Sequence, residues 1–121
     1  MNKELIRNDT IRLQQCNKEL MSIYNDTVKK GEPSDFYLVV KPYADEVFEL
    51  TDRWKEQVVI WIKKEKPKYL HPNQIDSTIE NLTTVALQAF YPDTRPKRFK
   101  ELIRSNEYIF ESIIHKLDGT D

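Results

Sequence analysis

The sequence predicts an all-α fold, an up-down-up-down antiparallel four-helix bundle in which residues 1–121 form a single domain. Three observations support this prediction. The chain contains only two glycines, whereas an all-β domain needs many tight turns with positive φ. Its six prolines fall into three pairs, and these divide the chain into four segments because proline is excluded from helix interiors. Each segment repeats apolar residues at the spacing of one helix face.

We expect helices at about residues 2–30, 42–66, 72–91 and 96–117. The first helix is closed by Lys29 and Lys30, which suit the negative end of the helix dipole, and then by Gly31, which tolerates the left-handed conformation. In the second helix, Trp54 and Trp61 lie seven residues apart in the apolar row and are predicted core anchors. The connections are short enough for successive helices to run antiparallel.

Residues 35–41 are predicted to form a short helical turn between the first two helices. The segment Phe36–Val40 has strand propensity, but five residues without a partner strand cannot form a sheet. Ser34 is the predicted cap of this turn. The turn is predicted to end before Lys41 and Pro42, because the residue before a proline avoids the α region.

Charge and cysteine content limit the class of protein. The 19 Lys and Arg residues against 20 Asp and Glu give a net charge of −1, which excludes a disordered polyelectrolyte and provides no overall attraction to nucleic acid or anionic membranes. Residues 1–7 carry charges where a signal peptide needs an apolar stretch, and the longest apolar runs are far shorter than the roughly 20 residues of a membrane span. The single cysteine rules out an internal disulfide. We therefore expect a cytoplasmic protein that does not associate with membranes.

The carboxylates of the second helix form a stripe opposite its apolar row, made of Asp45, Glu49, Asp52 and Glu56. We interpret this stripe as a solvated face in which Glu49 approaches Arg53 four residues later. An acidic docking face is the alternative.

Other chemistry-bearing residues do not form the pattern of a catalytic or metal site. Glu111 and His115 are four residues apart, whereas di-iron bundles need a spacing of three. Cys16 lies in mid-helix, away from the helix N-terminus that would activate a thiolate, and is predicted to pack as a small hydrophobe. Asn106 interrupts the apolar row of the fourth helix, where it either fixes helix register in the core or marks a groove open to solvent. We predict no catalytic residue, no metal site and no cofactor.

Basic residues form two clusters that antiparallel topology places at opposite ends of the bundle. One cluster ends the second helix, with Lys63, Lys64, Lys66 and Lys68 beside Tyr69 and His71. The other begins the fourth helix, with Arg95, Lys97, Arg98, Lys100 and Arg104. Since about a third of the chain is charged, a solvated surface is the ordinary interpretation. Cations at the positive end of a helix dipole are locally unfavourable, however, which favours a functional role.

The strings Lys66-Pro67-Lys68-Tyr69-Leu70-His71 and Lys97-Arg98-Phe99-Lys100, which follow Arg53-Trp54, resemble the YppE-like family of small uncharacterised proteins from Gram-positive, Bacillus-type bacteria. The likeness covers most of the chain from about Asp35 onward. It implies a four-helix bundle and brings no established activity. It directs attention to a candidate interaction surface that comprises Lys68, Tyr69, His71, Lys97, Arg98 and Lys100.

These observations favour a non-enzymatic protein-interaction or regulatory module whose partner is another protein. The alternative is a phosphate- or nucleic-acid-binding module that uses the basic bundle ends, and its binding would weaken steeply with salt. An enzyme would instead need a concave pocket lined by polar groups of shifted pKa. We expect the chain to be a monomer or a weak homodimer.

Overall fold

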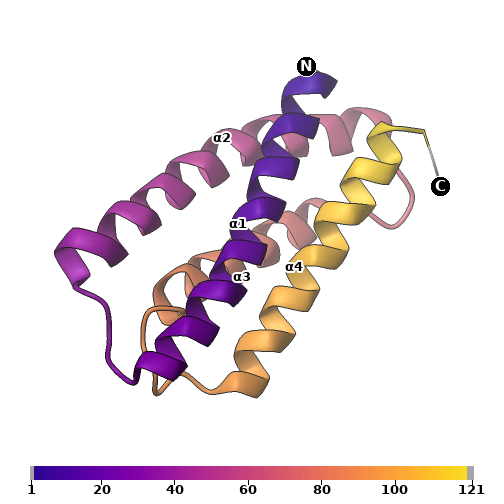
Figure 1. The fold of residues 1–121 in the computed structure, drawn as a ribbon. Helices are drawn as coiled ribbons and strands as arrows, with labels where there is room; N and C mark the ends of the chain where they lie inside the picture. Colours follow the sequence, from indigo (N-terminus) through magenta and orange to yellow (C-terminus); the bar gives the residue numbers. More distant parts are fainter. Residues whose placement is uncertain (1, 120–121) are drawn as a thin grey trace.

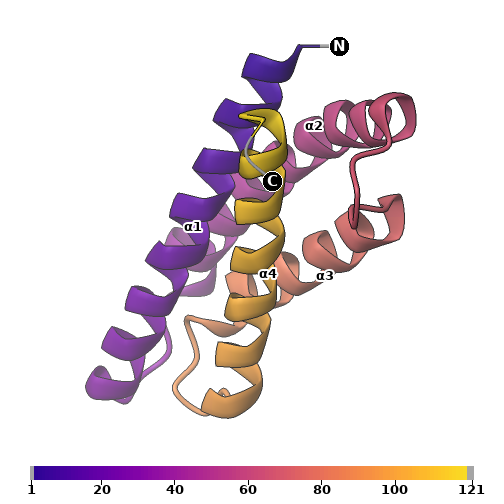
Figure 2. The same ribbon diagram turned by 90° about the vertical axis from the view of Figure 1, so that its right-hand side faces the viewer.

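A computed structural model describes residues 2–119, and within them the chain forms four long helices. They are α1 (Lys3–Lys30), α2 (Lys41–Glu65), α3 (Pro72–Gln88) and α4 (Pro96–Leu117). Successive helices run in opposite directions, and α1 and α4 form one layer in front of α2 and α3 (Figures 1 and 2). Each helix packs against the next and α4 closes against α1, so the predicted up-down-up-down bundle is confirmed. Residues 1, 120 and 121 of the predicted domain lie outside the described part of the chain.

The helix ends follow from local chemistry. The side chain of Asn2 accepts a hydrogen bond from the Leu5 N–H at 3.0 Å, which caps α1. At the other end of α1, Gly31 has φ 74° and donates its N–H to Thr27 O, the left-handed cap predicted for it. Helix α3 ends at Gln88, three residues before the expected end at residue 91. The N–H of Tyr91 bonds to Gln88 O in a tight turn, because the residue before Pro92 disfavours the α region.

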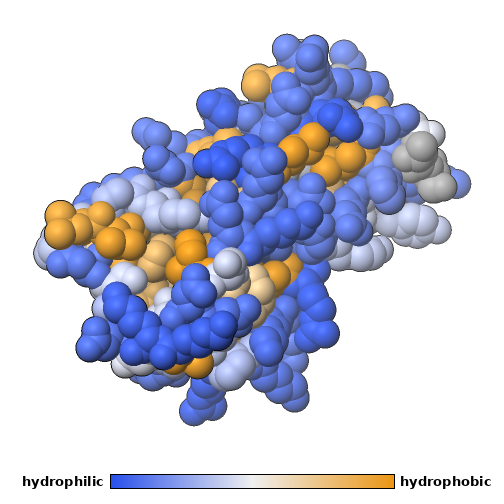
Figure 3. Space-filling model, in the orientation of Figure 1, coloured by the Kyte–Doolittle hydropathy of each residue, from blue (hydrophilic) through white to orange (hydrophobic). Residues whose placement is uncertain are grey.

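The segment before α2 differs from the prediction in two respects. Phe36–Val40 forms a single π-helical turn, η1, whose cap is Asp35 and not Ser34: the Asp35 carboxylate accepts the Leu38 N–H at 2.8 Å. The turn also does not end before Lys41. This residue has helical φ and ψ of −60° and −49°, and its N–H bonds to Phe36 O, so η1 continues directly into α2. Phe36, Tyr37, Leu38 and Val39 are exposed, while Val40 is buried. Figure 3 shows hydrophobic side chains at the end of the molecule where α1 connects to α2.

Aromatic side chains dominate the core between the two layers. Trp54 and Trp61 are both buried, as predicted for core anchors. The Trp54 indole donates its N–H to Thr10 Oγ1 at 2.9 Å and meets the Phe110 ring edge-to-face at 5.8 Å between centroids. Among residues 2–119, none of the helices combines the length and apolar character needed to cross a membrane.

A buried polar pair crosses the seam between α1 and α4. Asn106 is fully buried and donates to Asn17 Oδ1 at 3.2 Å, while Asn17 donates to Ile103 O at 2.9 Å. Of the two alternatives for Asn106, the structure therefore supports the buried one. An amide pair in an apolar seam favours one helix register, because a slip would leave both amides unpaired.

Candidate functional site

The connection between α2 and α3 is a tight loop held by two residues in the left-handed conformation. Lys66 has φ 47° and Tyr69 has φ 67°, and Pro67 follows the first of them. Lys66 ends α2 by donating its N–H to Ile62 O at 2.8 Å, a position that glycine usually occupies. Leu70 is buried and anchors the loop on the core. Each non-glycine residue in this conformation costs roughly 1–2 kcal/mol, so the loop geometry is strained.

This loop surrounds a shallow groove of about 450 Å³, called here the loop groove. It is lined by Ile62, Lys63, Lys66, Pro67, Lys68, Tyr69, Leu70, His71 and Pro72. Tyr69 is 80% exposed and has the left-handed conformation, which tyrosine rarely adopts. Apolar side chains and lysines line the groove together, and no Asp or Glu is among the described residues that line it.

His71 joins the loop to α3. Its backbone N–H donates to Gln74 Oε1 at 2.7 Å, which caps the start of α3 just before Pro72. The residue as a whole is exposed and borders the loop groove. The structure thus brings together three of the six predicted surface residues, Lys68, Tyr69 and His71.

The other three predicted surface residues, Lys97, Arg98 and Lys100, lie on the first turns of α4. They are exposed and are not among the residues that line the loop groove. Phe99 between them points into the core, where it stacks on Tyr24 with ring centroids 4.5 Å apart. The loop groove and the start of α4 lie at opposite ends of the bundle (Figure 1), so the two basic strings form separate surfaces.

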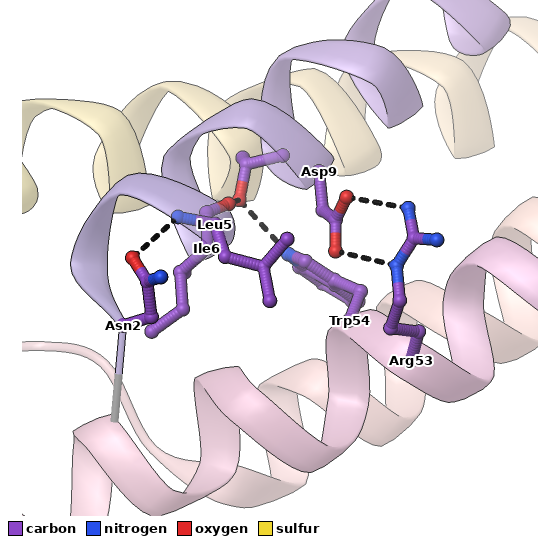
Figure 4. A network of polar contacts seen from close by, with 7 residues as sticks. Asn2, Leu5, Ile6, Asp9, Arg53 and Trp54 are labelled. Carbon is purple, nitrogen blue, oxygen red and sulfur yellow. Dashed lines mark hydrogen bonds and ion pairs between the residues drawn. The ribbon is translucent and has the colours of Figure 1, made fainter.

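An ion pair between α1 and α2 corrects the predicted partner of Arg53. Its guanidinium donates two hydrogen bonds to Asp9, at 2.7 and 3.0 Å, and not to Glu49 (Figure 4). Hydrogen bonding to Asp9 raises the pKa of Arg53. Asp9 is only 4% exposed and lies on the buried face of α1, three residues after Ile6. The sequence prediction missed this pair; the one local signal for it is a carboxylate in the apolar row of a helix, which requires a partner.

The α1–α2 groove, of about 690 Å³, lies beside this ion pair. It is lined by Arg12, Cys16, Tyr43, Glu46, Val47, Glu49, Leu50, Asp52, Arg53 and Glu56. Asp45, Glu49, Asp52 and Glu56 are exposed, as predicted for a solvated stripe. Within residues 2–119, no group of three His, Cys, Asp or Glu side chains is arranged to hold a metal ion.

Two titratable groups in the α1–α2 groove are shifted by burial. Burial raises the pKa of the Cys16 thiol, which keeps it protonated at neutral pH, so Cys16 packs as the predicted small hydrophobe. Burial also raises the pKa of the Tyr43 hydroxyl far above its ordinary value. That hydroxyl donates to Glu19 Oε2 at 3.1 Å, and Cys16 O lies 3.4 Å away. The Tyr43 hydroxyl therefore ties α2 to α1.

Comparison with known proteins gives a consistent family assignment. Residues 10–117 match the family described as "Bacterial domain of unknown function (DUF1798)". The chain is 31% identical over 98 residues to the uncharacterized protein YppE of Bacillus subtilis (strain 168), which covers 81% of this chain and 80% of that protein. These findings confirm the resemblance drawn from the two basic strings.

Solved structures agree with this assignment. The X-ray crystal structure of Bacillus subtilis yppE matches with a TM-score of 0.93 and 25% identity, over 98% of this chain and 97% of that chain. A crystal structure of a Listeria innocua protein of unknown function matches with a TM-score of 0.92 and 25% identity, over 97% of this chain and 94% of that chain.

Proposed function

The chain belongs to the DUF1798 family, and we propose that it is a non-enzymatic protein-interaction or regulatory module that docks an acidic segment of a cytoplasmic partner protein in the loop groove. The observation that carries this proposal is the conformation of Tyr69. A strained backbone persists only where the surrounding structure imposes it, and such residues cluster at functional sites. Here the strain holds an aromatic ring in water beside three lysines.

The chemistry of the loop groove supports an acidic protein segment as the partner. Lys63, Lys66 and Lys68 supply positive charge that no lining carboxylate offsets. The apolar floor, which includes Ile62 and Leu70, accommodates an apolar side chain of the same segment. Tyrosine is enriched among the residues that contribute most to binding energy at protein interfaces. Charge complementarity increases the association rate and selects against basic partners.

Lys97, Arg98 and Lys100 have a secondary role in this proposal. They lie at the opposite end of the bundle, beyond the reach of a segment held in the loop groove. Their charge adds to long-range attraction of an acidic partner, an effect that physiological salt largely screens beyond about 8 Å.

The proposal is tested by capturing partners on the immobilised chain from a lysate of the bacterium that encodes it, followed by titration of the recovered partner. We expect the double charge reversal Lys66→Glu and Lys68→Glu to weaken binding at least tenfold. The matched control, Lys97→Glu with Arg98→Glu, is expected to change binding by less than threefold. Equal losses in both variants, or no partner that distinguishes them, would contradict the proposal.

A phosphate or nucleic-acid ligand is the competing outcome of the same experiment. It is tested with inorganic phosphate and a single-stranded oligonucleotide as probes. Tight oligonucleotide binding with a steep linear dependence on salt would replace the protein partner by a nucleic acid. Sedimentation of the purified chain tests the accompanying expectation of a monomer or weak homodimer.

A further inference from the structure

A second groove runs between α3 and α4 and has an unusual lining. Its volume is about 540 Å³, and we call it the α3–α4 groove. It is lined by Asn73, Gln74, Ser77, Thr78, Asn81, Arg104, Ser105, Tyr108 and Ile109. Amide and hydroxyl side chains make up most of this lining. Arg104 is the one charged residue among the described residues that line the groove.

Three polar residues of α3 form a row along this groove, called here the ladder: Asn73, Ser77 and Asn81. They are spaced by four residues, which corresponds to about 6 Å along a helix with a rise of 1.5 Å per residue. An extended peptide repeats every two residues, at about 6.6–6.8 Å. The ladder spacing is therefore close to the repeat of an extended peptide backbone, and its two amides and one hydroxyl can both donate to and accept from peptide groups.

The ladder has hydrogen-bonding capacity that the fold does not use. Within residues 2–119, the side chains of Asn73, Ser77 and Asn81 make no hydrogen bond to another residue. Their neighbours differ in this respect, because Gln74 caps α3 and the Thr78 hydroxyl donates to Gln74 O at 2.8 Å. The row that faces the groove is thus free to bind a ligand.

The α4 side of the groove adds an aromatic ring and a cation. Tyr108 is 67% exposed, and Arg104 forms no ion pair with another residue of the described chain. Since α3 and α4 run antiparallel, Arg104 lies toward the Asn81 end of the ladder, and Tyr108 lies nearer its start. A ligand along the ladder therefore has a positive charge near the Asn81 end and Tyr108 nearer the Asn73 end.

Pro72 lines the loop groove and the next residue, Asn73, lines the α3–α4 groove, so the two grooves lie near each other at the start of α3. The lining of the two grooves contains Lys63, Lys66, Lys68 and Arg104, and no carboxylate is among the described residues that line either groove. Their charge is complementary to an acidic ligand long enough to pass through both.

We infer that the α3–α4 groove binds the extended backbone of the same acidic partner segment that the loop groove docks. This inference rests on the proposed function and identifies the form of the partner: an extended peptide with acidic residues at both ends of the contact. The ladder pairs with about four peptide residues. One carboxylate faces the lysines of the loop groove, and a second pairs with Arg104.

The test uses a phage-displayed library of random twelve-residue peptides, selected on the wild-type chain. Enriched peptides are synthesised and titrated against a ladder variant, Asn73→Ala with Ser77→Ala and Asn81→Ala. The matched control removes the same residue types from the exposed surface of α1, by Asn8→Ala, Ser22→Ala and Asn25→Ala. Circular dichroism and urea midpoints show that each variant is folded.

We expect enriched peptides to be acidic, to lose at least tenfold in affinity for the ladder variant and to bind the α1 control within twofold of wild type. N-methylation of alternate peptide bonds, which removes backbone donors, should weaken binding at least tenfold. If the peptides lose affinity for the Lys66→Glu, Lys68→Glu variant but bind the ladder variant normally, the inference is wrong and the proposed function stands. Loss on the ladder variant alone contradicts the proposed loop-groove docking. No enrichment, or no effect of N-methylation, overturns the inference.

Discussion

Two short strings, Lys68-Tyr69-Leu70 and Arg98-Phe99-Lys100, each pair an aromatic residue with basic residues, yet they place the aromatic residue in opposite environments. In the first, the tyrosine is 80% exposed and the leucine is buried. In the second, the aromatic ring is fully buried and the basic residues on either side are exposed. Both strings are basic and both contribute one apolar anchor to the core. They differ in which residue serves as that anchor.

The backbone explains this difference. Phe99 lies in the regular helix α4, whose 3.6-residue period places it on the face that packs against Tyr24. Tyr69 lies in the loop between α2 and α3, where both Lys66 and Tyr69 have positive φ and the backbone is not helical. An aromatic residue in a basic string is therefore structural in one setting and available for binding in the other. Four predictions test this distinction, beginning with the largest effect.

Replacement of the two aromatics should have very different effects on stability. Phe99→Ala is expected to lower the free energy of unfolding by about 3–5 kcal/mol, because it leaves a cavity in the core and removes the stacking on Tyr24. Tyr69→Ala should change it by less than about 0.5 kcal/mol, because the ring is in water. Urea unfolding at neutral pH measures both. A loss above about 2 kcal/mol in Tyr69→Ala would show that its ring packs against the protein.

The salt dependence of partner binding should come from the lysines of the loop groove and not from the basic residues that begin α4. Raising the salt concentration from about 0.05 M to about 0.5 M is expected to weaken wild-type binding roughly tenfold, since screening acts on exposed charges. Lys66→Ala with Lys68→Ala should reduce this salt dependence, whereas Lys97→Ala with Arg98→Ala should retain it. The measurement is the dissociation constant of the partner over a salt series. If the dissociation constant had the same salt dependence in both variants, the distinction between the two ends would be wrong.

Glycine should have opposite effects in the two strings. Tyr69→Gly is expected to raise the free energy of unfolding by up to about 1 kcal/mol, because glycine relieves the left-handed strain of about 1–2 kcal/mol against an entropic cost of about 0.5–1 kcal/mol. Lys100→Gly, in mid-turn of α4, should lower it by about 1 kcal/mol. Urea midpoints test both changes. Tyr69→Gly should also weaken partner binding, and a variant that is destabilised yet binds normally would contradict the role given to the strain.

The smallest expected effect is a loss of folding stability at alkaline pH. The two ends of the bundle should therefore be compared below the pH at which this loss begins. Burial raises the pKa of Cys16 above its value in the unfolded chain, which is about 8.5. The stabilisation is therefore complete below about pH 8.5 and is lost as the pH rises above it, because the unfolded state releases the proton first. Urea unfolding from pH 7 to 10 should show this decline, and Cys16→Ala should reduce its slope. A pH-independent wild-type chain would contradict it.

Sequence patterns were sufficient to locate the helices and to identify the face that each helix buries. Apolar rows located the helices and placed Trp54 and Trp61 inside. Gly31 marked the end of α1 because its left-handed φ is a local requirement. The error at η1 has a similar origin: Ser34 and Asp35 are both capping residues one position apart, and only the observed hydrogen bond to Leu38 distinguishes them.

Partners across helices could not be inferred in the same way. Arg53 was expected to approach Glu49 on its own helix, whereas it pairs with Asp9 on α1. The distance between these residues depends on how α1 and α2 pack, which local spacing does not specify. The α3–α4 groove was also missed, since its polar row becomes visible only when α4 lies beside α3.

The sequence by itself determined the four amphipathic helices, their order and their antiparallel course, because helical period and proline placement act over a few residues. Only the tertiary structure decided which of two similar basic strings surrounds a groove and which lies flat on a helix. That outcome depends on positive φ at Lys66 and Tyr69, and on the packing that sustains it. Backbone strain in non-glycine residues persists only where the surrounding structure imposes it, so amino-acid composition does not predict it.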